Sequence, residues 1–135
     1  MVFLLKNAHK YGQLNFYLKS QKKLNSQGYL ITYSSSAAVR KTLRNLGLEI
    51  FTIKPSFKKR TLWSQGTVAR SKFDNNKLKP NFNFEKLSLM EEEHLLTKAS
   101  IPYRDQDLNS SKDDIIKRRL DEQLFSNLLS TKKWR

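Results

Sequence analysis

The sequence contains no cysteine and only two histidines, His9 and His94. Disulfide bonds and thiolate metal sites are therefore excluded, and two histidines so far apart are too few to indicate a metal centre. Long apolar runs are also lacking, because the longest cover about five residues whereas a helix that spans a bilayer needs roughly 20. The run Met1-Val2-Phe3-Leu4-Leu5 is too short for the core of a signal peptide. We therefore expect a cytoplasmic chain that binds no metal and no membrane.

Acidic residues are scarce in the first part of the chain. Residues 1–80 hold 16 Lys or Arg but only two acidic residues, whereas residues 81–135 hold 10 residues of each sign, so the net charge of +14 arises entirely from the first part. A surface this basic is typical of proteins that bind a phosphate backbone with salt-dependent affinity. The asymmetry favours contact with nucleic acid. The alternative is a basic surface that serves only solubility.

The stretch from Gly28 to Ile50 predicts a strand, a turn, a helix and a second strand. Tyr29–Tyr33 is rich in β-branched and aromatic residues and suits a central parallel strand, and the serines that follow can cap the next helix. Gly47 fits the left-handed position that ends such a helix. The helix places Val39, Leu43 and Leu46 on one face and Arg40, Lys41 and Arg44 on the other.

Further elements extend this unit in both directions. Val2–Leu5 is a candidate strand, Gln13–Leu24 a candidate helix, and Leu48–Lys54 and Gly66–Lys72 are candidate strands. The order of strand, helix, strand, helix and strand implies right-handed crossovers and parallel pairing.

The residues after Lys72 differ in character. Residues 73–86 are rich in Asn and Lys without a period and predict a linker. Ser88 with Glu91 forms a capping box for a helix that runs through Lys98. A second capped helix opens at Ser111, and its apolar stripe comprises Ile115, Ile116, Leu120, Leu124, Phe125, Leu128 and Leu129.

The run Gly-Tyr-Leu-Ile-Thr-Tyr-Ser-Ser-Ser-Ala-Ala-Val-Arg from Gly28 to Arg40, with Leu46-Gly47-Leu48, resembles the fifth strand and following helix of the MnmC-type methyltransferases. Three further matches lie downstream in the same order as in that family. They are Lys59-Arg60 with Gly66-Thr67-Val68-Ala69, Ile101-Pro102-Tyr103-Arg104-Asp105, and the basic end Lys132-Lys133-Trp134-Arg135.

The resemblance implies an α/β fold, namely the C-terminal part of a class I, Rossmann-like methyltransferase sheet followed by a mainly helical tail. Residues 1–72 would form the partial methyltransferase domain, residues 73–86 the linker and residues 87–135 the tail. Gly66–Lys72 would then return antiparallel as the last strand of the sheet.

The resemblance also implies a chemistry. Family members use S-adenosylmethionine to methylate the aminomethyl group on the wobble uridine of certain transfer RNAs, so tRNA is the expected partner. In two-domain members a flavin-dependent oxidoreductase first removes a carboxymethyl group. Methyl transfer to an amine requires the neutral nitrogen to be aligned with the methyl donor.

The chain departs from the family where the coenzyme binds. Nothing before Val2 supplies a glycine-rich turn after a first strand or an acidic residue at the end of a second, and the acidic motif of the family falls on Leu5-Lys6-Asn7. We therefore expect no S-adenosylmethionine binding and no activity from this chain alone. Either the gene is truncated or frame-shifted, or a separate chain supplies the missing N-terminal half. The alternatives are a non-catalytic basic RNA-binding or accessory protein and a gene remnant without selected function.

Three groups of residues are candidates for substrate binding, each with a structural alternative. Tyr33, Ser34 and Ser35 stand where a strand ends, although serines there more often cap helices. Tyr103 and Arg104 belong to a tail that folds back beside the active face, although a local Arg–Asp pair with Asp105 is the favoured alternative. The basic loop at 56–65 contributes Lys58, Lys59, Arg60 and Trp63, which suit phosphates and an unpaired base, unless its aromatic rings simply pack on the sheet.

Overall fold

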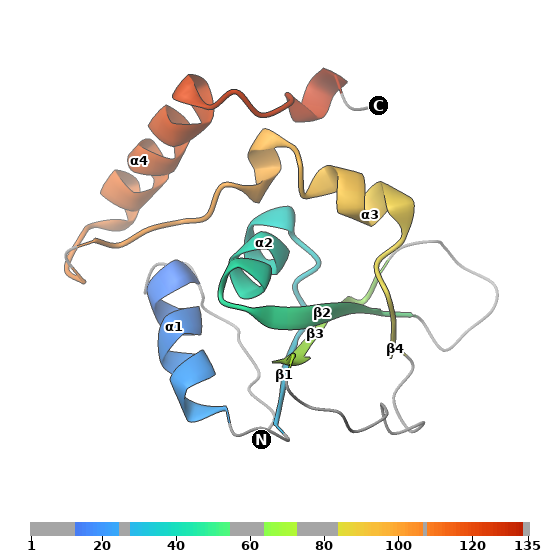
Figure 1. The fold of residues 1–135 in the computed structure, drawn as a ribbon. Coiled ribbons are helices and arrows are strands. Elements are labelled where there is room, and N and C mark those ends of the chain that lie inside the picture. The colour runs from blue at the N-terminus through green and yellow to red at the C-terminus, as the bar shows by residue number, and fades with distance from the viewer. Residues whose placement is uncertain (1–12, 25–27, 55–63, 73–83, 107, 134–135) are drawn as a thin grey trace.

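The computed structural model describes residues 13–24, 28–54, 64–72, 84–106 and 108–133 of the 135-residue chain. Four α-helices and four strands lie within these ranges, together with short 3-10 turns at Lys98–Ser100 (η2) and Thr131–Lys133 (η3) (Figure 1). Their order is α1 Gln13–Lys23, β1 Tyr29–Thr32, α2 Ala37–Asn45, β2 Leu48–Ile53, β3 Gly66–Ser71, β4 Phe84–Glu85, α3 Leu89–His94 and α4 Lys112–Phe125. Among these helices, none combines the length and the apolar character that crossing a membrane requires.

The strands form one sheet in the order β1-β3-β2-β4, and every neighbouring pair is antiparallel. The antiparallel return of β3 is therefore confirmed. The expected parallel pairing of Tyr29–Tyr33 with Leu48–Lys54 is wrong, because β1 and β2 point the same way but β3 lies between them and bonds to both. The pairing expected for Val2–Leu5 lies outside the described residues. Helix α2 connects β1 to β2 and leaves room between them for one strand. β3 occupies this position, and its backbone forms hydrogen bonds with both β1 and β2.

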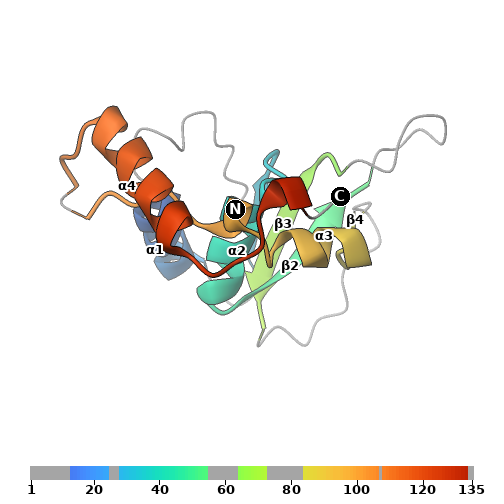
Figure 2. The ribbon, with the colours of Figure 1, turned by 90° about the horizontal axis from the view of Figure 1, so that it is seen from above.

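One hydrophobic core joins the helices, the sheet and the C-terminal part of the chain. Its fully buried members come from α1, β1, α2, β2, β3 and the residue after α3, and they include Tyr17, Leu30, Val39, Leu43, Ile50, Ala69 and Leu95. On the other face of β2, Phe51 packs against the ring of Phe84, with ring centroids 5.5 Å apart. Seen from above, α4 lies over the α1 side of the molecule and β4 at the far side (Figure 2).

The expected helix caps are present. Ser36 accepts a hydrogen bond from the Val39 N–H at 3.3 Å, and Gly47 ends the helix with a φ of 81°. Ser88 and Glu91 form the predicted capping box, and Ser111 caps α4 by accepting from the Asp114 N–H. These caps supply partners for the N–H groups that the first helical turn leaves free.

The tail differs from the sequence-based expectation at three points. Helix α3 ends at His94 rather than Lys98, because the Thr97 hydroxyl donates to the His94 carbonyl and accepts from the Ala99 N–H. Of the apolar stripe expected on α4, only Ile115 is buried. Phe84–Glu85, at the end of the expected linker, forms a short strand on β2, whereas residues 73–83 and the expected strand Val2–Leu5 lie outside the described residues.

Substitution of Gly66 tests how closely β3 approaches the end of β1. A Cβ at this position would lie 2.3 Å from the Thr32 carbonyl oxygen and 3.1 Å from the Tyr33 Cα, and neither backbone atom can move aside as a flexible side chain could. We expect Gly66→Ala to lower the free energy of unfolding by about 3 kcal/mol, as overpacking does. Urea denaturation monitored by circular dichroism measures the change.

Gly47→Ala is the matched control. Nothing lies within 4 Å of a Cβ there, so only the positive φ is penalised, at about 1 kcal/mol. Equal losses in the two variants would contradict the close approach of β3 to β1.

Candidate functional site

The end of β1 is fixed by hydrogen bonds to the helix and strand beside it. The Ser34 N–H donates to Thr32 Oγ1 at 3.1 Å, and the Thr67 hydroxyl of β3 donates to the Ser34 carbonyl at 2.8 Å. Ser34 and Ser36 also share a hydrogen bond between their hydroxyls. The predicted capping role of the serines therefore falls to Ser36, and Ser34 shapes the turn.

Tyr33 is the exposed aromatic residue of this turn. Its side chain is 74% exposed, and the Ser35 side chain beside it also faces solvent. The turn thus presents an aromatic ring and a hydroxyl at the carboxyl end of β1, the edge where α/β proteins bind ligands. This arrangement is consistent with the substrate-binding role predicted for Tyr33 and Ser35, which stays a prediction.

A buried arginine lies directly beneath this turn. Arg40 of α2 is only 3% exposed, so its expected place on the solvent face of the helix is wrong. Its Nε donates to Thr67 Oγ1 at 2.9 Å and its Nη1 to Glu91 Oε1 at 2.8 Å. The remaining contacts of Nη2 are to Thr52 Oγ1, Ser64 Oγ and the Gly66 carbonyl oxygen. The guanidinium therefore joins α2, β2, β3 and α3.

Glu91 is the anionic partner that makes burial of Arg40 possible. Burial by itself raises the pKa of the Glu91 carboxyl, but hydrogen bonds from the Ser88 backbone N–H and from Arg40 outweigh it and hold the pKa below its ordinary value of 4.5. The Thr52 hydroxyl donates to the same carboxylate at 2.9 Å. Removal of either partner leaves the other charge without compensation, which costs far more than loss of an exposed pair.

A second pair lies one turn further along α2. Arg44 donates to both carboxylate oxygens of Glu92, at 2.6 and 2.7 Å. These hydrogen bonds lower the pKa of Glu92 and raise the pKa of Arg44. Both side chains are more than a third exposed, so we expect this pair to contribute less than the Arg40 pair.

The segment 101–105 folds back onto the first turn of α1. The Leu14 N–H donates to the Tyr103 carbonyl at 3.3 Å, and the Asn15 side-chain amide donates to the Asp105 carbonyl. The expected local pair between Arg104 and Asp105 is wrong. Arg104 instead pairs with Glu122 of α4 at 3.1 Å, and Asp105 accepts from the Ser110 N–H. Because α4 supplies a carboxylate within reach, the arginine spans two elements rather than one turn.

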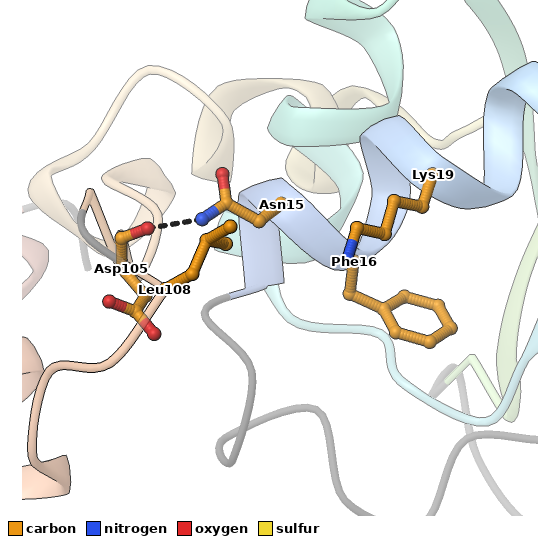
Figure 3. Close-up of a pocket in the computed structure, with 5 residues that line it drawn as sticks. All are labelled: Asn15, Phe16, Lys19, Asp105 and Leu108. Atoms are coloured by element: carbon orange, nitrogen blue, oxygen red, sulfur yellow. Dashed lines mark hydrogen bonds between the residues drawn. The ribbon is translucent and has the colours of Figure 1, made fainter.

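A cavity of about 430 Å³ opens where this segment meets α1 (Figure 3). Its lining residues are Asn15, Phe16, Lys19, Asp105 and Leu108. In Figure 3, Asn15, Phe16 and Lys19 project from α1, and Asp105 and Leu108 face them from the returning segment. The volume is in the range of small-ligand pockets. The lining combines an aromatic ring with one cationic and one anionic side chain, Lys19 and Asp105, so it offers a surface for stacking but no net charge.

The predicted site residues are therefore held in separate places. The turn at Tyr33 is fixed by α2 and β3, whereas Tyr103 rests on α1 and lies under the Arg119 guanidinium, 4.3 Å from the ring centroid. Lys58, Lys59, Arg60 and Trp63 lie outside the described residues. The sequence analysis missed the roles of Arg40, Glu91 and Asn15. Thr52, between Phe51 and Ile53, and Thr67, next to Val68, are polar residues beside apolar ones in their strands and could have indicated a buried polar partner.

The described residues do not fit the coenzyme of a Rossmann-like methyltransferase. Such a site needs a glycine-rich turn directly after a strand and an acidic residue at a strand end. Gly47 ends a helix and Gly66 begins β3, while β1 and β2 are followed by Tyr33 and Lys54. No chemical step is therefore assigned to a coenzyme on these residues.

Comparison with known proteins places these observations in context. Residues 6–68 match a family model described as S-adenosyl-L-methionine-dependent methyltransferase. Among solved structures, the chain is similar to MNMC2 from Aquifex aeolicus, with 22% identity and a TM-score of 0.68 over 91% of this chain. The match covers 38% of that structure, so the chain spans less than two fifths of its length. No curated protein matches the chain.

The buried ion pair leads to a stability prediction. Arg40→Met should lower the free energy of unfolding by about 4 kcal/mol, because Glu91, whose side chain is only 17% exposed, then loses its cation and the buried acceptors of Arg40 lose their donor. Arg44→Met is the matched control and should cost about 1 kcal/mol or less, since the Arg44–Glu92 pair is exposed. Urea denaturation of both variants measures the difference, and a similar cost for the two would contradict the buried network.

The lowered pKa values of Glu91 and Glu92 predict a loss of stability in acid. Because the folded carboxylates bind protons less readily than the unfolded ones, their contribution is complete above the ordinary value of 4.5 and is lost as pH falls through the folded values. Urea midpoints measured between about pH 7 and about pH 3 should show this decline. Glu91→Gln should be less stable near neutral pH but should decline less in acid. Parallel pH curves for the two proteins would contradict the assignment.

Proposed function

We propose that the chain is a member of the MnmC-like S-adenosylmethionine-dependent methyltransferases and forms the substrate side of a tRNA wobble-uridine methyltransferase. The observation that carries the proposal is the family match over residues 6–68, which includes α1, β1, α2 and β2. The exposed turn at Tyr33 lies inside the matched range.

We assign this chain the task of binding and orienting RNA. The charge of +14, all of it from residues 1–80, favours contact with a phosphate backbone. The exposed lysines of α1, namely Lys19, Lys22 and Lys23, add to the cations of Lys58, Lys59 and Arg60, which the sequence predicts to lie in a loop. Tyr33 offers an exposed ring on which an unpaired base can stack, and Trp63 is predicted to offer another.

The methyl donor would be held by polypeptide outside these 135 residues. The described residues do not fit that coenzyme, and 62% of the structural relative has no counterpart in this chain. We therefore propose that the chain acts together with an N-terminal methyltransferase portion in the cytoplasm and does not methylate RNA alone. Translation of the upstream DNA in all frames will show whether the same gene or a separate one encodes that portion.

A non-catalytic basic RNA-binding protein is the second candidate. The uneven charge favours it, because salt-dependent binding to any RNA backbone requires no coenzyme and no substrate pocket. The two candidates differ in what they recognise, since only the methyltransferase reading requires a preference for the aminomethylated uridine.

Binding measurements with anticodon stem-loops test the proposal. We expect a roughly tenfold preference for a loop with an aminomethyl wobble uridine over the same loop without that group, since a positioned amine contact contributes about 1.4 kcal/mol. Tyr33→Ala should remove most of the preference, because a base that no longer stacks does not hold its aminomethyl group in place, and should leave stability nearly unchanged, because the residue is 74% exposed. Fluorescence anisotropy at two salt concentrations gives the affinities.

The outcomes separate the candidates. Equal affinity for both loops, weakened alike by salt, would contradict the methyltransferase reading and support the accessory one. Calorimetric titration with S-adenosylmethionine completes the test, because stoichiometric binding by this chain alone would show that the coenzyme site is not elsewhere.

A further inference from the structure

Helix α4 is attached to the molecule by its polar face. The Arg119 guanidinium donates to the backbone carbonyls of Ile101 at 2.8 Å and Ala99 at 3.2 Å. Gln123 donates to the Lys98 carbonyl at 2.9 Å, and Ile115 is the one buried apolar residue of the helix. Most amphipathic helices pack their apolar face inward, so α4 is inverted relative to the usual arrangement.

The apolar face of α4 consequently points to solvent. Ile116, Leu120 and Leu124 recur at every fourth position, which places them on one side of the helix, and we call them the α4 stripe. Their side chains are 37%, 56% and 72% exposed. Three more exposed apolar residues follow at the end of the helix, namely Phe125, Leu128 and Leu129. A row of this kind marks an interaction surface.

The charges beside the α4 stripe alternate in sign, so the stripe of one copy can pair with the same stripe of a second copy. Asp113, Lys117 and Asp121 run along one flank of the stripe with alternating sign, and within the described residues neither Lys117 nor Asp121 belongs to an ion pair. The helix carries four basic and four acidic residues and is neutral, in a chain of net charge +14. Two copies that meet here keep their basic portions out of the contact and avoid repulsion between them.

We propose that the α4 stripe is the contact between two copies of this chain, which pair antiparallel about a two-fold axis near Leu120. In this arrangement Ile116 of each copy meets Leu124 of the other, and Lys117 of each lies near Asp121 of the other. A two-fold contact uses the same patch twice, as this charge order allows. The proposal does not depend on the methyltransferase assignment.

Analytical ultracentrifugation of the full chain tests the pairing. We expect a monomer–dimer equilibrium, and Leu120→Glu should raise the dimer dissociation constant by about 100-fold or more, because each dimer loses two buried leucines and gains two charges. Leu89→Glu is the matched control, since Leu89 is 76% exposed on α3 and outside the stripe. Circular dichroism checks that both variants are folded.

Charge reversal tests the orientation. Lys117→Glu and Asp121→Lys each place like charges on the same flank, so each variant alone should dimerise more weakly than the unchanged chain. An equimolar mixture should form dimers again, because the acidic flank of one variant meets the basic flank of the other.

Three results would overturn the proposal. They are a monomer at every accessible concentration, a dimer that Leu120→Glu leaves intact, and a mixture of the two charge variants that associates no better than either alone. A monomer would leave the stripe to a different partner, such as the portion of the structural relative that this chain lacks.

Discussion

The fold depends on the hydrogen bonds and the ion pair that compensate one buried cation, the guanidinium of Arg40. The Arg40 guanidinium can be buried only if most of its donors find acceptors and its charge finds a carboxylate. Acceptors come from Thr52 and Thr67 in the sheet, whereas the carboxylate of Glu91 comes from a segment 51 residues later. The tail must therefore dock on α2 for the helix to lie on the sheet, and Leu95 completes the same core.

This constraint also shapes the exposed turn at Tyr33. Thr67 accepts from Arg40 and donates to the Ser34 carbonyl, so the buried network supports the turn that exposes Tyr33. The tail continues from α3 to the first turn of α1 and forms the cavity there. The charge is divided in a similar way, because the basic portion contributes β1, β2 and β3 of the sheet, whereas the neutral portion contributes β4 and the helices of the tail.

Local patterns were sufficient to predict most elements of the described chain. Strand and helix periods placed α1, β1, α2, β2 and β3 within a few residues, and serine caps located the start of α2, α3 and α4. The errors arose where a long-range partner decides the outcome. The spacing of residues along α2 placed Arg40 on the solvent face, because spacing within one helix contains no information about a distant partner such as Glu91. For the same reason it could not indicate that Arg119 attaches α4 by its polar face. The pairing of β1 with β3 likewise depends on a strand that comes later in the chain.

The sequence by itself determined the element types, the caps, the charge asymmetry and the resemblance to a methyltransferase, because each is written in neighbouring residues or in composition. The tertiary structure alone decided which charges are buried, which apolar residues remain exposed and where segment 101–105 makes a cavity with α1. These features depend on pairs such as Arg40 and Glu91. The two charges attract each other strongly only after distant parts of the chain have packed together and excluded water from around them.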